Sequence, residues 1–309
     1  MTVNAPSRPP QERAARLISL TGAALMAFAL NSLLCRAALA SRLIDPLSFT
    51  LVRIGSGAIV LLLLARSFAN ERASSPWAGL DSLASPTALV VYALAFSSAY
   101  ADLSAGTGAF VVFCCVQITM IGWDLRLGAR LRLREGLGLG TAVVGLAWLT
   151  RPGAGSPNPA AVALMALSGL AWGVYSLRGR AGGPPLQATS RNFLLATPLA
   201  ALACAFSMSS LYADPRGLAL AAVSGGITSG LGYVAWYAAL PSLTRTRASI
   251  LQLSVPPLTA ILGVLLLGES LSPRLLVAAP LILAGIAMAV SRPETAPSSA
   301  GASMRGADS

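Results

Sequence analysis

Residues 248–290 read ASILQLSVPPLTAILGVLLLGES, then LSPR, then LLVAAPLILAGIAMAV. Each of the two apolar runs approaches the ~20 residues that a helix needs to cross the ~30 Å hydrocarbon core of a bilayer. The turn LSPR between them is short and charged, so the two runs are predicted to form a transmembrane hairpin. Pro256 and Pro257 remove backbone donors from the first run, and in lipid the freed carbonyls must be satisfied by neighbouring helices, side chains or water. The stretch therefore predicts a helix packed inside a bundle.

A similar hairpin lies 140 residues earlier, where Gly128 and Gly145 correspond to Gly268 and Gly285. Single identities are weak evidence in a chain so rich in leucine and alanine. The fixed offset across the whole hairpin is the stronger observation, and it predicts an internal repeat.

The composition is typical of a membrane protein. Hydrophobic residues make up 55% of the 309 residues, charged residues make up 11%, and the mean hydropathy is +0.70. A soluble globular domain of this length does not have these values. The chain has no lysine and no histidine, so all 22 basic residues are arginines. They lie between apolar runs instead of clustering with aromatic residues, which favours membrane topology over nucleic-acid binding as the cause of the net charge of +11.

The apolar runs predict an all-α polytopic membrane protein with ten transmembrane helices. These are expected at residues 17–40, 46–65, 87–101, a fourth run ending near 121, 136–149, 160–177, 192–208, 217–240 and the two runs of the hairpin. The glycine- and proline-rich linker 152–159 divides them into two five-helix repeats, 17–151 and 160–291. Residues 1–16 form a predicted cytoplasmic tail, and residues 292–309, rich in Ser, Ala, Gly and Pro, form a predicted disordered cytoplasmic tail.

The arginines predict the orientation. With a cytoplasmic N-terminus, sixteen of the 22 lie on the cytoplasmic side, five lie outside and Arg53 lies within the second helix. This asymmetry favours cytoplasmic positions for both termini. An odd number of helices in each repeat then inverts the second repeat relative to the first. Inverted repeats around a site near the midplane are a common plan of secondary transporters.

Several motifs resemble the EamA-type ten-helix permeases of the drug/metabolite transporter (DMT) superfamily. They are LLLGESL at 265–271, LILAGIAM at 281–288, PLSFTLVRIGSGAIVLLLL at 46–64 with Arg53 in the arginine place, Trp172-Gly173, and Asn192. The first repeat departs from the pattern, because Val116-Gln117 and Ala129 stand where the second has Pro256-Pro257 and Glu269. The resemblance implies a secondary transporter of the bacterial inner membrane. It would export a small polar or amphipathic metabolite, such as an amino acid, by alternating access around a central cavity.

An intramembrane enzyme is one alternative function. Such an enzyme needs an activated nucleophile with a base, or a metal held by histidines or carboxylates, and the chain has no histidine. Because there is no lysine, there is also no GxxxxGK[ST] motif for ATP binding. A non-transporting membrane sensor is the other alternative, and it usually carries a soluble signalling domain for which the two tails are too short. We therefore expect no catalytic residues and no cofactor.

Arg53 and Glu269 are the two charged candidates. A charge inside an apolar helix costs at least ~2.5 kcal/mol on insertion scales, so Arg53 should face a partner or water. It is either a contact for an anionic or carboxylate-bearing substrate or a structural arginine bonded to carbonyls or to a loop acid. Glu269 is either a proton-coupling carboxylate or a structural residue of the turn after Gly268.

Aromatic and amide side chains complete the predicted site. Tyr92, Phe96 and Tyr100 recur every four residues and so share one helix face. Aromatic residues also form interfacial belts, and amides also bond across helices for ~0.6 kcal/mol on average, so each has a structural alternative. The predicted substrate-binding residues are Asn31, Arg53, Tyr92, Phe96, Tyr100, Gln117, Trp172, Tyr175, Asn192, Trp236 and Gln252, with Glu269 for coupling. The four cysteines lie in apolar runs and are expected to be packing residues, so no metal site is predicted. The expected partners are a small-molecule substrate and the lipid bilayer, and the small-residue helix faces permit a homodimer.

Overall fold

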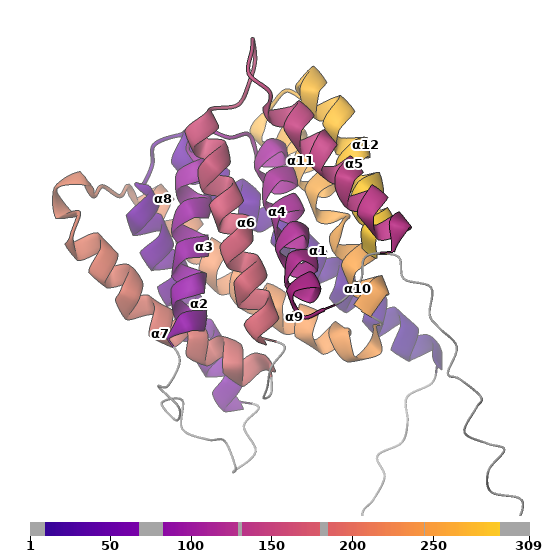
Figure 1. Ribbon diagram of the computed structural model, residues 1–309. Coiled ribbons are helices and arrows are strands. Elements are labelled where there is room, and N and C mark those ends of the chain that lie inside the picture. The colour runs from indigo at the N-terminus through magenta and orange to yellow at the C-terminus, as the bar shows by residue number, and fades with distance from the viewer. Residues whose placement is uncertain (1–9, 68–82, 129–131, 180–184, 244, 291–309) are drawn as a thin grey trace, which may run out of the picture.

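The computed structural model describes residues 10–67, 83–128, 132–179, 185–243 and 245–290, which form a bundle of α-helices (Figure 1). Its main helices are α1 (Pro10–Ala40), α2 (Pro46–Ser67), α3 (Ala84–Tyr100), α4 (Ala105–Arg126), α5 (Leu133–Thr150), α6 (Pro159–Gly179), α7 (Pro185–Ala205), α8 (Pro215–Val223), α9 (Gly232–Ala239), α10 (Arg245–Gln252), α11 (Val255–Leu267) and α12 (Pro273–Val290). Within these residues the β-structure is a single isolated bridge, Ile44 with Ala213. The α1 helix begins at Pro10, inside the tail predicted for residues 1–16. The tail predicted to be disordered, 292–309, lies outside the described residues.

Seven segments among the described residues are long and apolar enough to cross a membrane. They are Gln11–Ala40, Pro46–Ser67, Ala105–Arg126, Pro159–Arg178, Pro215–Ser242, Ile250–Leu267 and Pro273–Val290. The α3 helix is apolar but shorter. The prediction of an all-α polytopic membrane protein is therefore confirmed, with seven of the predicted crossings established by length and composition.

The segment Pro215–Ser242 is continuous but changes its winding. Between α8 and α9 it becomes a π-helix, η2 (Ser224–Leu231), and it ends in the 3₁₀ turn η3 (Leu240–Ser242). Long π-helical segments are rare and occur most often at functional sites. This change of winding was not predicted from the sequence.

The first helix of the opening hairpin is interrupted between α10 and α11, at Leu253 and Ser254. Pro256 lacks the N–H that would bond to the carbonyl four residues earlier, so the helix breaks just before the proline pair. The α4 helix has Val116 and Gln117 at the corresponding place and is continuous. The departure of the first repeat from the family pattern therefore has a structural consequence.

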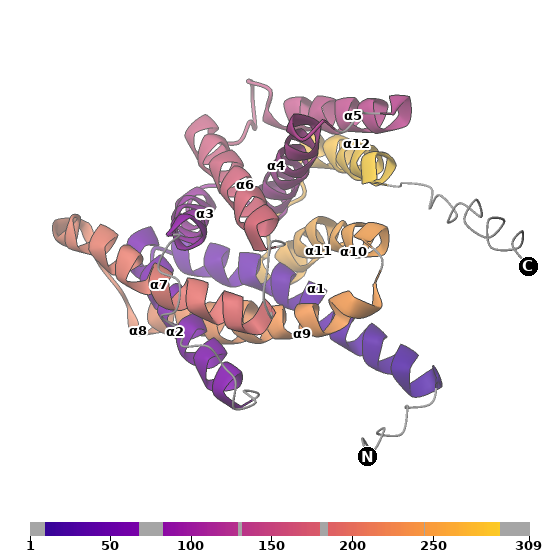
Figure 2. The same cartoon turned by 60° about the horizontal axis from the view of Figure 1, so that its bottom comes forward.

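Helices α5 and α12 lie side by side at one edge of the bundle (Figures 1 and 2). They are antiparallel, because Gly145 meets Ile282 whereas Gly138 meets Ala289 further along α12. A Cβ on Gly285 would lie 2.5 Å from the Ala142 amide nitrogen, so only glycine allows the two backbones to approach this closely. Small residues at a contact are the usual means of packing helices in lipid.

Candidate functional site

Arg53 is buried in α2, with 3% of its surface exposed. Its Nη2 donates to the Tyr92 hydroxyl at 3.0 Å, and its Nε donates to Ser229 Oγ at 3.4 Å. Its Nη1 is buried without a hydrogen-bond partner in the described structure. The guanidinium also lies 5.4 Å from the ring centroid of Tyr92 and 5.2 Å from that of Phe96. Among the residues that the structure describes, the side chain of Arg53 thus contacts hydroxyls and aromatic faces, and it bonds neither a carbonyl nor a loop acid.

The π-helix η2 contributes the polar side chains that lie next to Arg53. Asn31 of α1 accepts hydrogen bonds at its Oδ1 from Ser224 Oγ at 2.7 Å and from Thr228 Oγ1 at 3.2 Å. Ser229 of the same segment accepts the bond from Arg53. One short segment of the second half of the chain therefore binds both α1 and α2 of the first half.

Trp172 of α6 joins the aromatic candidates into one cluster. Its ring centroid lies 4.7 Å from that of Tyr92, 5.3 Å from that of Tyr175 and 5.7 Å from that of Tyr233. The rings of Trp172 and Tyr233 are stacked, with an interplanar angle of 15°. Because Tyr92 also bonds Arg53, four predicted aromatic residues, Tyr92 and Phe96 of α3 and Trp172 and Tyr175 of α6, form one cluster with the buried cation.

Trp236 is connected to this cluster by way of Phe28. Its ring lies 6.0 Å from that of Phe28, and Phe28 lies 5.9 Å from Tyr233. Phe193 also packs edge-on against Tyr233, at 6.0 Å. Neither phenylalanine was predicted from the sequence, because an apolar ring in a membrane helix carries no signal that separates a site from packing.

The predicted amides are divided among different places. Asn192 Nδ2 donates to the Tyr175 hydroxyl at 3.4 Å and so adjoins the aromatic cluster. Gln117 is buried within α4, and Gln252 ends α10 half-buried. The bonds that connect Arg53 to Tyr92 and η2 include neither glutamine.

Tyr100 and Glu269 lie in a second cluster at a helix end. The Tyr100 hydroxyl donates to the Ala105 carbonyl at 3.2 Å, and its ring packs edge-on against Phe96 at 4.7 Å. Glu269 forms an ion pair with Arg36 at 3.0 Å and accepts the Ala105 N–H at 2.8 Å. Arg36 Nη1 donates in addition to the carbonyls of Tyr100 and Ala101. Glu269 therefore ties α1, the start of α4 and the hairpin turn together, which is the geometry of the turn role weighed above.

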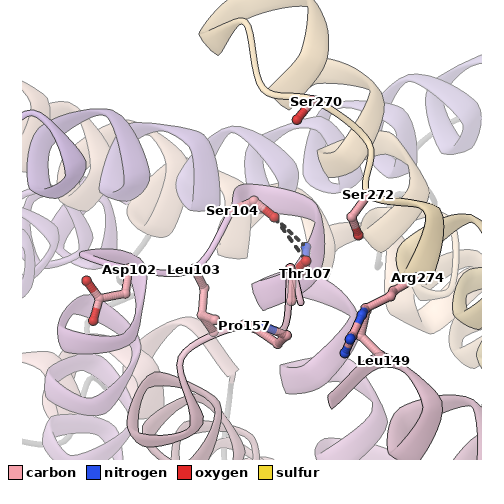
Figure 3. A pocket seen from close by; sticks show the side chains of 10 residues that line it. Asp102, Leu103, Ser104, Thr107, Leu149, Pro157, Ser270, Ser272 and Arg274 are labelled. Atoms are coloured by element: carbon pink, nitrogen blue, oxygen red, sulfur yellow. Dashed lines mark hydrogen bonds between the residues drawn. The ribbon is translucent and has the colours of Figure 1, made fainter. Parts of the chain in front are cut away.

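A pocket of about 190 Å³ with a mixed polar and apolar lining lies at the same end of the bundle (Figure 3). It is formed by the α3–α4 junction, the loop after α5 and the start of α12, including Asp102, Thr107 and Arg274. Arg274 is engaged there by the carbonyls of Arg151 and Ala154. None of the predicted substrate-binding residues lines this pocket.

Comparison with known proteins agrees with the helical architecture and the motifs. Residues 159–291 match the EamA-like transporter family. An uncharacterized protein of Pseudomonas aeruginosa is 47% identical over 277 residues, which cover 88% of this chain and 94% of that protein. A solved crystal structure is 19% identical with a TM-score of 0.62, covers 88% of this chain and 98% of its own, and is similar in fold. The chain is a multi-pass membrane protein that belongs to the EamA-like transporter family.

Proposed function

We propose that this protein is a secondary transporter of the bacterial inner membrane that exports a small polar or amphipathic metabolite, such as an amino acid. The observation that carries the proposal is Arg53, a buried cation with an unpartnered Nη1 and without an acidic partner in the described structure. Burying a charge this way is costly unless something compensates it, and intramembrane charges commonly mark substrate pathways. A substrate group at Nη1 supplies the missing partner.

The transport mechanism that we propose is alternating access by two inverted five-helix repeats. An offset of 140 residues carries the bounds of α5, 133–150, onto those of α12, 273–290. It also carries the start of α4 at residue 105 onto the start of α10 at 245. The pairing of helices supports a two-fold relation, because α5 packs on its own counterpart α12 and α2 packs on its counterpart α7. Likewise α3 packs on α6, and their counterparts under the same offset, η2 with α9 and α1, also pack on each other.

The repeats require ten crossings, so α3, α5 and α7 complete the seven apolar spans. The 17 residues of α3 extend about 26 Å at 1.5 Å per residue, close to the ~30 Å of a hydrocarbon core. The start of α1 and the end of α12 lie on the same side of the bundle (Figure 1), in line with cytoplasmic positions for both termini. The exposed apolar side chains of α5, such as Leu137 and Val144, face lipid or a second copy in a homodimer.

Two sets of contacts at the proposed external end support entry of the substrate from the cytoplasm. Arg36 and Glu269 join α1 to the hairpin turn, as described above. On the other side, Asp45 accepts the N–H of Tyr212 at 2.9 Å, next to the Ile44–Ala213 bridge. The loop before α2 and the loop before α8 are therefore bound to each other. Opening to the outside has to break both connections.

Transport in proteoliposomes tests the proposal. Purified protein is reconstituted with a mixture of amino acids, organic acids, sugars and nucleosides, and efflux is measured by mass spectrometry with and without a pH gradient. We expect one class to leave vesicles with wild-type protein and to stay in vesicles with Arg53→Gln. Arg66→Gln, an exposed arginine of the same helix, is the matched control and should transport normally. A proton-coupled carrier with Glu269 as the coupling carboxylate requires the gradient to drive uphill movement that Glu269→Gln abolishes. Failure of every class to move refutes the transporter.

A further inference from the structure

The charge balance around Arg53 restricts the substrate's head group. The carboxylates of the described residues all lie in loops or in the terminal turns of helices: Glu12, Asp45, Asp102, Asp124, Glu135, Asp214 and Glu269. One of these acids, Glu269, forms an ion pair with Arg36, at the end of the bundle and apart from Arg53. The centre that contains Arg53 and the Trp172 cluster therefore has a positive charge and no compensating acid in the described part of the chain.

The bonds of Arg53 leave one of its nitrogens, Nη1, available to an anionic group. A guanidinium has five N–H donors and no acceptor. In this structure they reach a tyrosine hydroxyl and a serine hydroxyl, both neutral, while Nη1 reaches nothing. Hydrogen bonds from a guanidinium to a carboxylate are shorter and stronger than those to neutral groups. A carboxylate at Nη1 would thus gain the strongest bond that the centre can offer.

A group of aromatic rings is also a common site for a cationic ligand, since ammonium groups bind to such faces. Here the rings of Tyr92 and Phe96 already have a cation within 5.4 and 5.2 Å, namely Arg53 itself. A second cation would meet a like charge in a buried place, which disfavours it.

We propose that the centre selects amphipathic monocarboxylates, and that a substrate's ammonium group, where present, is not required. The carboxylate binds Arg53 Nη1, and the apolar or aromatic body packs against the stacked rings of Trp172 and Tyr233. This inference rests on the proposed function for the role of the site, since it narrows the substrate class of the same centre. A free monoanion such as chloride has the same chemistry at Nη1 and is the second source of the anionic group.

Three ligands with one body and different heads test the selection. They are 3-phenylpropionate, 3-phenylpropionamide and 3-phenylpropylamine, which carry a negative, a neutral and a positive head at pH 7. Binding to the purified full-length protein is measured by calorimetry at constant ionic strength, with and without sodium chloride. We expect the acid to bind at least tenfold more tightly than the amide and the amine. Competition by chloride identifies the free anion as a ligand of the same site, and its absence assigns the site to the substrate's carboxylate alone.

Variants of Arg53 test whether this side chain causes the preference for the acid over the amide. Arg53→Lys keeps the charge and should retain a reduced preference for the acid, whereas Arg53→Gln should bind acid and amide equally. Arg66→Gln should behave as wild type. If Arg53→Gln does not yield folded protein, the head-group series on wild type and Arg53→Lys still decides the matter. Equal binding of acid and amide by wild type, or no binding by any of the three, overturns the inference. Either of these two outcomes leaves the transporter proposal intact if vesicles still release a metabolite. Selective binding of the acid without transport, in contrast, refutes the transporter proposal and supports the proposed monocarboxylate site.

Discussion

Replacing Gly225 by alanine tests whether the π-helix is packed against Arg53 as the structure shows. An added Cβ would lie 2.0 Å from the Arg53 carbonyl oxygen and 2.1 Å from Ser56 Oγ. Side-chain carbons do not come within 3.0 Å of backbone atoms, so η2 and α2 must separate by about 1 Å or more. Overpacking of this kind costs about 1–3 kcal/mol, which corresponds to about 5- to 150-fold in an equilibrium constant. The separation also moves Ser229 away from Arg53 Nε, so we expect loss of transport together with loss of stability.

The adjacent glycine provides the control for this prediction. In Gly226→Ala the new Cβ lies 3.2 Å from Val60 Cγ2, a side-chain methyl that can move, and in Gly140→Ala it meets nothing within 4 Å. The three variants are compared by melting temperature in detergent and by efflux from vesicles. Gly225→Ala should melt at the lowest temperature and transport least, and Gly140→Ala should match wild type. If Gly225→Ala melts and transports as Gly140→Ala does, the packing of η2 on α2 is not as described, and the site built on it fails.

Three further substitutions test contacts that hold together the helices and loops around the site that contains Arg53. Glu269→Gln weakens the charged bond to Arg36, which is worth about 1.5–3 kcal/mol in general, so a cysteine placed at Ser104 should react faster with a water-soluble thiol reagent. Unchanged labelling contradicts its role in closing this end. Asp45→Ala removes the acceptor of three backbone N–H groups and should cost about 0.5–2 kcal/mol, seen as a lower melting temperature that Asp45→Asn largely restores. Gly285→Ala should cost about 1–3 kcal/mol by separating α12 from α5, and a melting temperature equal to that of Gly140→Ala would refute this contact.

The sequence predicted those features that depend on composition and on nearby residues. The sequence showed that Pro256 and Pro257 remove backbone donors, and the break that the structure places before Pro256 is a consequence of the missing N–H. Arg53 could be identified as a candidate from the sequence because a charged side chain in an apolar helix is costly in any orientation and needs a partner or water. The spacing of Tyr92, Phe96 and Tyr100 correctly placed the three rings along one helix face, since consecutive rings contact each other.

Features that depend on distant residues could not be read in this way. The periodicity of α3 gives the face of Tyr100 but not its depth, and the structure places it beside the Arg36–Glu269 cluster instead of beside Arg53. The partner of Glu269 lies 233 residues away in the chain. The segment SGGITSGL forms a π-helix whose Gly225 contacts the backbone of α2. Local helix propensities cannot predict a contact with a distant helix.

The centre is asymmetric although the helices around it obey the 140-residue offset. This offset carries Arg53 onto Phe193, so the repeat by itself predicts two buried cations or none. Phe193 instead packs edge-on against Tyr233 and fills the space beside Gly57, where an added Cβ would lie 2.8 Å from its ring. A second arginine there would put two positive charges into a centre whose described residues include no acid, and each would raise the cost of the other. Arg53 of the first half bonds one hydroxyl from each half, Tyr92 and Ser229, and the stacked rings of Trp172 and Tyr233 in the same cluster come from the second half. This arrangement is the one proposed above to bind a ligand with a single negative charge and an apolar body. In the mechanism proposed above, such a ligand would contact both proposed repeats at once and stay bound while they exchange conformations.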